Sequence, residues 1–211
     1  MRFEIITEAD ARRIPRGAVV ELAAGGHVTP LARDTLAERR VTVVPAGSVD
    51  PALPPDLPPV ADIRRVALGS DHTTVALRRA IVAHLRGRGL RVDEHGPDAA
   101  APAVDYPDVA AAVARAVARG EADAGIVLDG AGLGSAIAAN KVRGVRAAMC
   151  TDETLARYAR EHNGANVLTL GGTLVSPDAA IRIVDVWMST PMREPRYIRR
   201  LLKIRRLEDQ F

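Results

Sequence analysis

Downstream of residue 62, short apolar runs alternate with longer amphipathic stretches. Four runs are largely apolar, at 66–68, 125–128, 145–149 and 166–170, and a weaker strand candidate lies at 91–93. The stretches between them repeat apolar residues at helical spacing, at 75–88, 107–119, 135–141, 152–161 and 177–188. Apolar strands separated by helices are typical of a parallel sheet covered on both faces. We therefore predict a doubly wound, Rossmann-like α/β domain with five parallel strands, which binds its ligands at the carboxyl ends of the strands.

Prolines divide the chain. Six of the 14 prolines lie between Pro45 and Pro59, and such a stretch favours an extended, semi-rigid linker. We place this linker at 45–61, between a small N-terminal module at 1–44 and the main domain at 62–211. The module is predicted to be α+β, with strands at 3–6 and 41–44 and a helix that starts near Thr7. Thr29-Pro30 is typical of an N-cap followed by the first helical residue, and predicts a second helix at 31–40. So short a module buries little surface, and we expect it to dock on a partner or another subunit.

Composition narrows the class of protein. The 211 residues are 47% hydrophobic and 26% charged, which is ordinary for a folded globular protein. No apolar run approaches the ~20 residues of a membrane span, and the first residues lack the apolar core of a secretory signal. The single cysteine, Cys150, excludes a disulfide framework and a cysteine-rich zinc site, and we expect it to pack in the core. We expect a cytoplasmic protein with no membrane partner.

Positive charge gathers at the carboxyl end of the chain. From residue 192 onward there are seven basic and three acidic residues, so this segment has a net charge of +4. The whole chain has a net charge of +3, so the remaining residues sum to −1. A basic helix at 194–207 can bind nucleic acid, clamp a small phosphorylated molecule, or be simply solvated. Aromatic residues are only 3%, so the stacking platforms of single-strand binders are missing. Arg196 and Arg200 are four residues apart on one helix face, which favours a clamp for one small phosphate over a nucleic-acid surface.

Two candidate site clusters directly follow predicted strands. Asp71-His72 comes after the strand at 66–68, and an Asp-His pair at the start of a helix can bind an anion or a sugar hydroxyl. Asp129 comes after the strand at 125–128 and precedes the alternating glycines Gly130, Gly132 and Gly134. Glycines let backbone amides face inward as a nest for an oxyanion or phosphate, and Asp129 is suitably placed to act as a general base. The simpler alternatives are that Ser70 or Asp71 caps a helix and that Asp129 shapes a turn or a helix start.

A third cluster closes the helix at 152–161. His162 can move protons near neutral pH, and Asn163 can bind hydroxyls. The alternative is a histidine favoured by the helix dipole and followed by a C-cap asparagine. We expect this cluster to join the other two at the carboxyl end of the sheet.

Several ordered motifs resemble one known family. The runs 67–72 (ALGSDH), 104–108 (VDYPD), 120–125 (GEADAG), 134–142 (GSAIAANKV), 160–168 (REHNGANVL) and 183–187 (IVDVW) resemble the type B ribose-5-phosphate isomerases, which include the galactose-6-phosphate isomerase subunits. The resemblance covers about 66–207. It implies an aldose–ketose isomerase of carbohydrate metabolism that needs no metal and no organic cofactor and acts on a sugar phosphate through an enediolate. It also implies sites between two subunits of a homodimer or homotetramer.

The resemblance also implies roles for single residues. By motif match, His162 opens the sugar ring, Asn163 contacts the developing enediolate, and Asp71 contacts a sugar hydroxyl. The amides of Gly130, Gly132 and Gly134 form the oxyanion cradle, and His72, Arg196 and Arg200 bind the phosphate. Asn140, in the same glycine-rich motif, is a further candidate for substrate binding.

Departures from the family pattern point to altered chemistry. The position of the usual cysteine base is Asp129, which becomes our candidate carbon base, and the glutamate used by other members is Ser135. Ala131 replaces a hydroxyl residue that assists ring opening, Thr173 replaces an arginine, and Tyr197 replaces a histidine. An open-chain or shorter sugar phosphate fits the Ala131 change. The alternative function is a catalytically altered sugar-phosphate-binding or scaffold protein.

The N-terminal module has a fainter resemblance of its own. The runs 5–10 (IITEAD) and 28–34 (VTPLARD) resemble an extension found on bacterial microcompartment-associated enzymes. This resemblance implies a docking element and association with a microcompartment.

Overall fold

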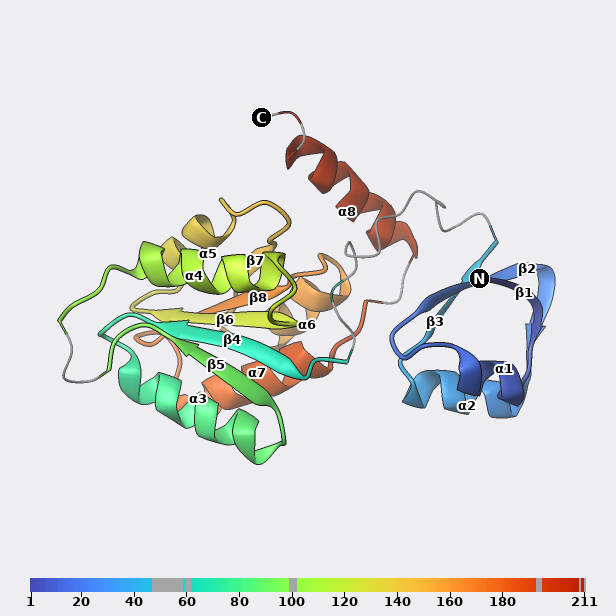
Figure 1. The fold of residues 1–211 in the computed structure, drawn as a ribbon, viewed down its shortest axis with the longest axis horizontal. Helices are drawn as coiled ribbons and strands as arrows, with labels where there is room; N and C mark the ends of the chain where they lie inside the picture. Colours follow the sequence, from blue (N-terminus) through green and yellow to red (C-terminus); the bar gives the residue numbers. More distant parts are fainter. Residues whose placement is uncertain (47–58, 60–61, 99–101, 193–194, 209, 211) are drawn as a thin grey trace.

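A five-stranded parallel sheet forms the main body of the computed structural model (Figure 1). The structure describes residues 1–46, 59, 62–98, 102–192, 195–208 and 210, so most of the predicted linker at 45–61 lies outside the described residues. The strands are β4 (Arg65–Ser70), β5 (Arg91–His95), β6 (Ala124–Asp129), β7 (Ala147–Met149) and β8 (Val167–Gly171), in the order β5-β4-β6-β8-β7. All neighbouring strands pair in parallel, which confirms the predicted doubly wound class.

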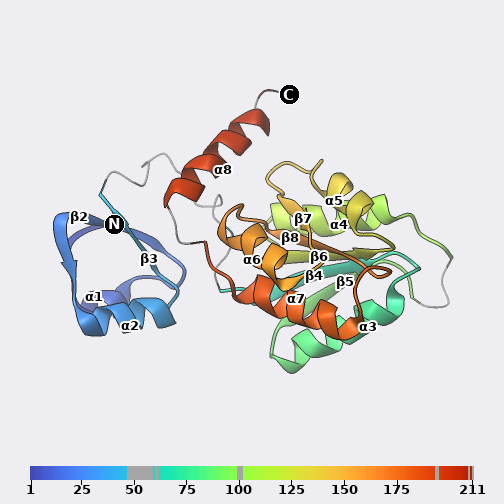
Figure 2. The same cartoon turned by 180° about the vertical axis from the view of Figure 1, so that it is seen from behind.

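Helices cover both faces of this sheet. Helices α3 (Val75–Gly87), α6 (Glu153–Glu161) and α7 (Pro177–Ser189) share one core with the larger apolar side chains of the strands. Helices α4 (Tyr106–Ala118) and α5 (Leu133–Ala139) cover the other face through a second core of small residues. Figure 2 shows the same layers from behind. Helix α4 approaches the sheet closely because Gly69 has no side chain: a Cβ there would lie 2.5 Å from Val109 Cγ1.

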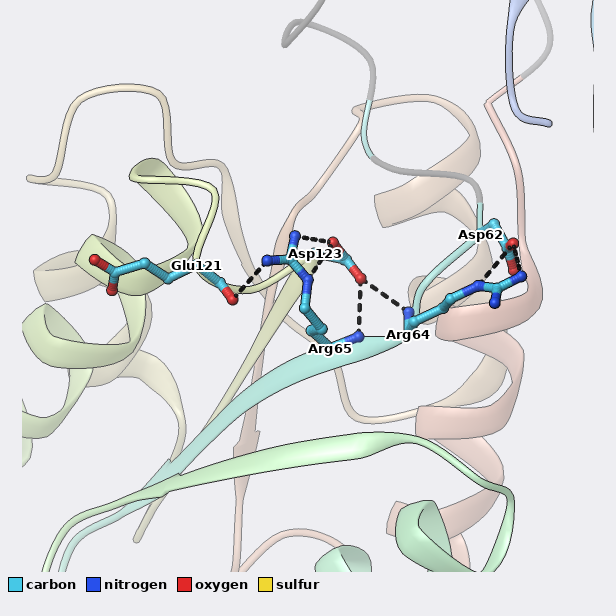
Figure 3. Close-up of polar contacts among 5 residues, drawn as sticks. All are labelled: Asp62, Arg64, Arg65, Glu121 and Asp123. Atoms are coloured by element: carbon cyan, nitrogen blue, oxygen red, sulfur yellow. Dashed lines mark hydrogen bonds and ion pairs between the residues drawn. The ribbon is translucent and has the colours of Figure 1, made fainter. Parts of the chain in front are cut away.

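Asp123, just before β6, ties β6 to β4. Its Oδ2 accepts hydrogen bonds from the backbone N–H groups of Arg64 (2.9 Å) and Arg65 (2.8 Å), and its Oδ1 lies 2.6 Å from Nη2 of Arg65. Figure 3 shows these contacts, with Arg65 also donating to the Glu121 carbonyl. The carboxylate therefore fixes the amino ends of the two central strands against each other.

The N-terminal module is a three-stranded parallel sheet in the order β1-β2-β3. It comprises β1 (Arg2–Ile6), α1 (Glu8–Arg13), β2 (Val19–Val28), α2 (Pro30–Glu38) and β3 (Thr42–Pro45). Thr7 and Asp10 form a capping box at α1, and Pro30 is the first residue of α2, as predicted. The sequence analysis missed β2, so the module alternates strands and helices and is more regular than the predicted α+β arrangement.

Helix α8 (Pro195–Glu208) follows the main domain and lies beside one end of the sheet (Figure 1). Its residues Tyr197, Ile198 and Leu201 are buried together with Met192 in a small apolar cluster. Near its carboxyl end, Glu208 accepts hydrogen bonds from the Gly144 N–H at 3.1 and 3.2 Å. The described part of the chain contains no helix that is long and apolar enough to cross a membrane.

Candidate active site

The glycine loop, residues 130–134, follows β6 and is fixed to the end of β8. The Gly130 carbonyl accepts hydrogen bonds from the Thr173 N–H (3.0 Å) and Oγ1 (2.6 Å), and the Gly132 carbonyl accepts one from Thr169 Oγ1 (2.8 Å). Gly132 has a φ of +77°, and a Cβ there would lie 2.9 Å from the Gly171 nitrogen. A positive φ and this close approach both require glycine, so the backbone fits only one residue type at this position.

Asp129 faces its own loop. Its Oδ1 accepts hydrogen bonds from the N–H groups of Ala131 (2.8 Å) and Gly132, and its Oδ2 accepts them from Ser135 N–H (3.0 Å) and Ser135 Oγ. A carboxylate has about four lone-pair sites, so four donors occupy all of them, and the residue is only 4% exposed. This disagrees with the prediction that Asp129 is the carbon base, because a base needs a free lone pair directed at substrate. The alternative of a turn-shaping aspartate describes the geometry better.

Asp71 lies beside Asp129 at the end of the neighbouring strand. Ser70 pairs with Leu128 in the β4–β6 register, and the Asp71 N–H donates to the Leu128 carbonyl (3.2 Å). Its Oδ1 accepts hydrogen bonds from Thr73 N–H (2.9 Å), Thr73 Oγ1 (2.6 Å) and Thr74 Oγ1 (3.4 Å). Its Oδ2 accepts no hydrogen bond from the described residues. Polar side-chain atoms that are both fully buried and without a partner do occur among these residues, but Asp71 Oδ2 is not one of them. The 7% of Asp71 that is exposed therefore includes this oxygen.

The first residue of α4 and the segment before it form one wall at this end of the sheet. The exposed His72 has its Nδ1 3.3 Å from the Val104 carbonyl. The Tyr106 ring covers Gly134 so closely that a Cβ there would lie 2.5 Å from two ring carbons. Asp71, His72 and the glycine loop thus meet at the carboxyl end of the sheet, as predicted, with Tyr106 as a neighbour that the sequence analysis did not single out.

His162 belongs to a stack of rings at the end of α6. Its ring lies 4.6 Å from that of Tyr158 and 4.5 Å from that of Tyr197, and Arg200 lies above the Tyr197 ring with its Cζ 5.6 Å from the centroid. The exposed Asn163 donates to the Tyr158 carbonyl at 3.0 Å. Arg196 is in the first turn of α8, and its side chain lies outside the described residues. His162, Asn163 and Arg200 are therefore neighbours, and their separate roles stay predictions.

The two groups lie at opposite ends of the sheet. Strand β8 begins at Val167 opposite Gly125 and ends at Gly171 opposite Asp129, so residues 162–163 precede the amino end while the glycine loop follows the carboxyl end. Five residues of strand span about 15 Å. The prediction that all three clusters meet at one edge is wrong, because a loop that leads from a helix into a parallel strand lies at the amino end of the sheet.

Comparison with known proteins covers the residues at both ends of the sheet. Residues 66–204 match the family model described as Ribose/Galactose Isomerase. The chain is 39% identical over 148 residues to ribose-5-phosphate isomerase B of Escherichia coli, covering 70% of this chain and 99% of the relative. It is 38% identical over 123 residues to D-erythrulose-4-phosphate isomerase of Pectobacterium atrosepticum, covering 58% and 81%. The solved structure of Clostridium thermocellum ribose-5-phosphate isomerase B superposes with a TM-score of 0.67 at 45% identity, covering 69% and 98%.

The chain belongs to the ribose/galactose isomerase family. The match begins at residue 66, so it does not bear on the N-terminal module, whose docking role and microcompartment association stay predictions. Among the described residues of this family member, no group of three or more histidine, cysteine, aspartate or glutamate side chains is arranged to hold a metal ion.

The turn that carries His162 and Asn163 is held by two arginines in this isomerase-family chain. Buried Arg160 donates to the Ala165 carbonyl (2.8 Å) and lies over the Trp187 ring, with its Cζ 4.7 Å from the centroid. Arg146 donates to the Gly164 carbonyl at 2.8 Å. Burial, with Arg146 nearby, lowers the pKa of Arg160 to about 9. Sequence reasoning missed both residues, because the local sequence does not separate an arginine that holds a turn from one on the surface.

Asn140 anchors the edge strand β7. Its side-chain amide donates to the Ala136 and Ala147 carbonyls, both at 2.9 Å, and its Oδ1 accepts from the Ala147 N–H at 2.8 Å. The two bonds with Ala147 use the side-chain amide as a substitute for strand pairing, and the bond to Ala136 holds it against α5. The substrate-binding role of Asn140 stays a prediction. The residue also lines a mainly apolar groove of about 440 Å³, together with Asn163 and with Ile204, Leu207 and Glu208 of α8.

Proposed function

We propose that the chain is an aldose–ketose isomerase that acts on a phosphorylated sugar of four to six carbons. The observation that carries this proposal is the pair of half-sites within a chain of this family: a carboxylate beside amide donors at one end, and a histidine beside an arginine at the other. Such a reaction needs a base at carbon, donors for the enediolate oxygens, an acid–base group for ring opening, and a cation for the phosphate. The chain offers a candidate for each of these needs.

The carboxyl-end half supplies the oxyanion donors. The Ala131 and Gly132 amides donate to Asp129, so we remove Gly132 from the predicted cradle. Within the described residues, the N–H groups of Gly130, Leu133 and Gly134 have no acceptor. These three amides are our candidates for the cradle, and His72 is our candidate phosphate ligand on this side.

The amino-end half supplies the proton shuttle and the phosphate clamp. Tyr158 and Tyr197 flank the His162 ring, which limits its rotation and fixes the direction of its two nitrogens. We assign ring opening to His162, a hydroxyl contact to Asn163, and phosphate binding to Arg196 and Arg200. Arg200 presents a planar donor group suited to two phosphate oxygens at once.

Two copies of the chain complete each site. Because the half-sites of one chain lie at opposite ends of its sheet, the His162 half of one copy must meet the glycine loop of another. Leu133 and Ile137 are 58% and 65% exposed on one face of α5, directly after that loop. A second copy whose groove brings Asn163 to the loop also covers these two side chains. We therefore propose a two-fold dimer, with two sites per pair and pairing into a tetramer as its extension.

A panel of sugar phosphates tests the function. The purified chain is incubated with ribose 5-phosphate and with four- and six-carbon aldose phosphates, and the ketose product is followed by NMR. We expect turnover of at least one of them. Saturable binding without turnover of any, and without deuterium exchange from D₂O, would contradict the proposal and favour the sugar-phosphate-binding or scaffold alternative.

A further inference from the structure

Two carboxylates stand side by side at the carboxyl end of the sheet, and only one of them has an oxygen that accepts no hydrogen bond from the part of the chain that the structure describes. Asp71 and Asp129 follow the paired residues Ser70 and Leu128 on adjacent strands, which lie about 4.8 Å apart. Either side chain can therefore reach the space above the ends of β4 and β6. The contacts of each carboxylate decide which of the two is available for chemistry.

We infer that Asp71, rather than Asp129, is the carbon base of this enzyme; the inference rests on the proposed isomerase function. All four hydrogen-bonding positions of Asp129 are used by Ala131, Gly132 and Ser135. Moving a proton to Asp129 would break at least one of these bonds and release the glycine loop. The Oδ2 of Asp71 accepts no hydrogen bond within the described residues, while Thr73 and Thr74 hold Oδ1 in a fixed direction. A side chain fixed through one oxygen and open at the other is suited to taking a proton from substrate.

The step balances without a cofactor. Asp71 Oδ2 takes the proton from C1 of the ketose phosphate, and the C–H electron pair forms the C1–C2 double bond while the carbonyl electrons move to O2. The resulting carboxylic acid returns its proton to C2 as the second carbonyl forms at C1, with one proton passing from O1 to O2. Asp129 is a positioning residue in this scheme, because it sets the loop that presents the amide donors.

Deuterium exchange on a ketose phosphate separates proton removal from ring opening. Ribulose 5-phosphate and erythrulose 4-phosphate cannot close a five-membered ring, because the hydroxyl that would close it is absent or esterified. Exchange at C1 in D₂O therefore needs the carbon base and no ring-opening group. We expect Asp71→Asn to lower the exchange rate by about 10² to 10⁴, the usual contribution of a positioned base. Calorimetric binding of a non-reacting sugar-alcohol phosphate should change by only a few-fold.

Matched variants complete the experiment. Asp129→Asn, assayed below its melting temperature, should lose about tenfold or less through loop distortion, and the exposed Asp178→Asn, at the start of α7, should keep the wild-type rate. Added formate should restore part of the exchange in Asp71→Ala, an effect that a purely structural role would not produce.

Any of three results would overturn the inference. The first is an Asp71→Asn variant that keeps most of the wild-type rate of exchange at C1, and the second is a folded Asp129→Asn variant whose exchange rate falls as far as that of Asp71→Asn. The third is an Asp71→Ala variant whose exchange rate formate does not raise. Wild-type protein that exchanges neither ketose and turns over no aldose would overturn the proposed function itself, and the assignment of the base with it.

Discussion

Replacing Asp129 by asparagine exchanges one of the two carboxylate oxygens that accept hydrogen bonds from the loop and Ser135 for an NH₂ group. Whichever way the new amide turns, its NH₂ group faces two donors, either the Ala131 and Gly132 amides or the N–H and Oγ of Ser135. The Ser135 hydroxyl can rotate and accept a hydrogen bond, but a backbone N–H cannot. At least one buried N–H is then unpaired and the charge-assisted bonds become neutral, so we expect a loss of about 2–4 kcal/mol in the free energy of unfolding.

This loss is measured by urea or thermal unfolding of Asp129→Asn beside wild type. For a chain of this size it lowers the melting temperature by about 5–15 °C. Ser135→Ala removes one of the four donors and should cost less, about 1–2 kcal/mol. The double variant should fall short of the sum, because both substitutions break the same contact. An Asp129→Asn protein within about 0.5 kcal/mol of wild type would refute the loop-fixing role.

Three further predictions follow from local geometry. Burial alone would raise the pKa of Asp123, but the hydrogen bonds from Arg65 and the backbone outweigh burial, so the pKa is lowered in the folded protein. The Asp123 carboxylate therefore stabilises the fold above about pH 4, and this stabilisation is lost as the pH falls below the pKa of the unfolded chain, near 3.8. Urea unfolding should show Asp123→Asn less stable than wild type by about 1–3 kcal/mol at pH 7. The difference should shrink as the pH falls below 3.8, and a difference that does not change with pH would contradict this. Burial raises the pKa of the Cys150 thiol to about 12, so a thiol reagent should modify it only after unfolding, and rapid labelling of native protein would show the burial to be wrong. Gly132→Ala forces a Cβ to 2.9 Å from the Gly171 nitrogen at a φ of +77°, so it should destabilise the protein by about 1–3 kcal/mol and reduce turnover. Gly130→Ala places its Cβ more than 4 Å from every atom of the described residues outside its chain neighbours, and it should be milder in a thermal melt.

The fold of the main domain was predictable because its central strands are buried on both faces and therefore read as apolar runs. The edge strand β5 gave a weaker pattern, since three of its five residues are exposed. Strand β2 was missed because Gly25-Gly26 interrupts it, and glycine pairs are more typical of turns. Gly25 has a φ of +78°, and a Cβ at Gly26 would lie 2.8 Å from two backbone oxygens, so the strand is irregular for a structural reason.

The sequence motifs named candidate site residues but not their arrangement. Asp71, His72 and the glycine loop follow strands and so lie at the carboxyl end, whereas His162 and Asn163 precede a strand and lie at the amino end. Chain order alone contains this distinction. The direction of the Asp129 carboxylate is different, because it depends on how the loop amides turn and on Ser135, six residues further along. Local sequence offered a base and a turn-shaping residue equally well.

The central claim is that each active site is built from the carboxyl-end half of one chain and the amino-end half of another. Asp71→Asn impairs the first half and His162→Ala the second, so each variant alone should be nearly inactive. Co-expression with two affinity tags yields mixed dimers, each with one doubly altered site and one unaltered site. Random pairing of equal amounts therefore restores about 25% of wild-type turnover, and isolated mixed dimers about 50%. Mixed dimers no more active than the two parents would contradict the shared site.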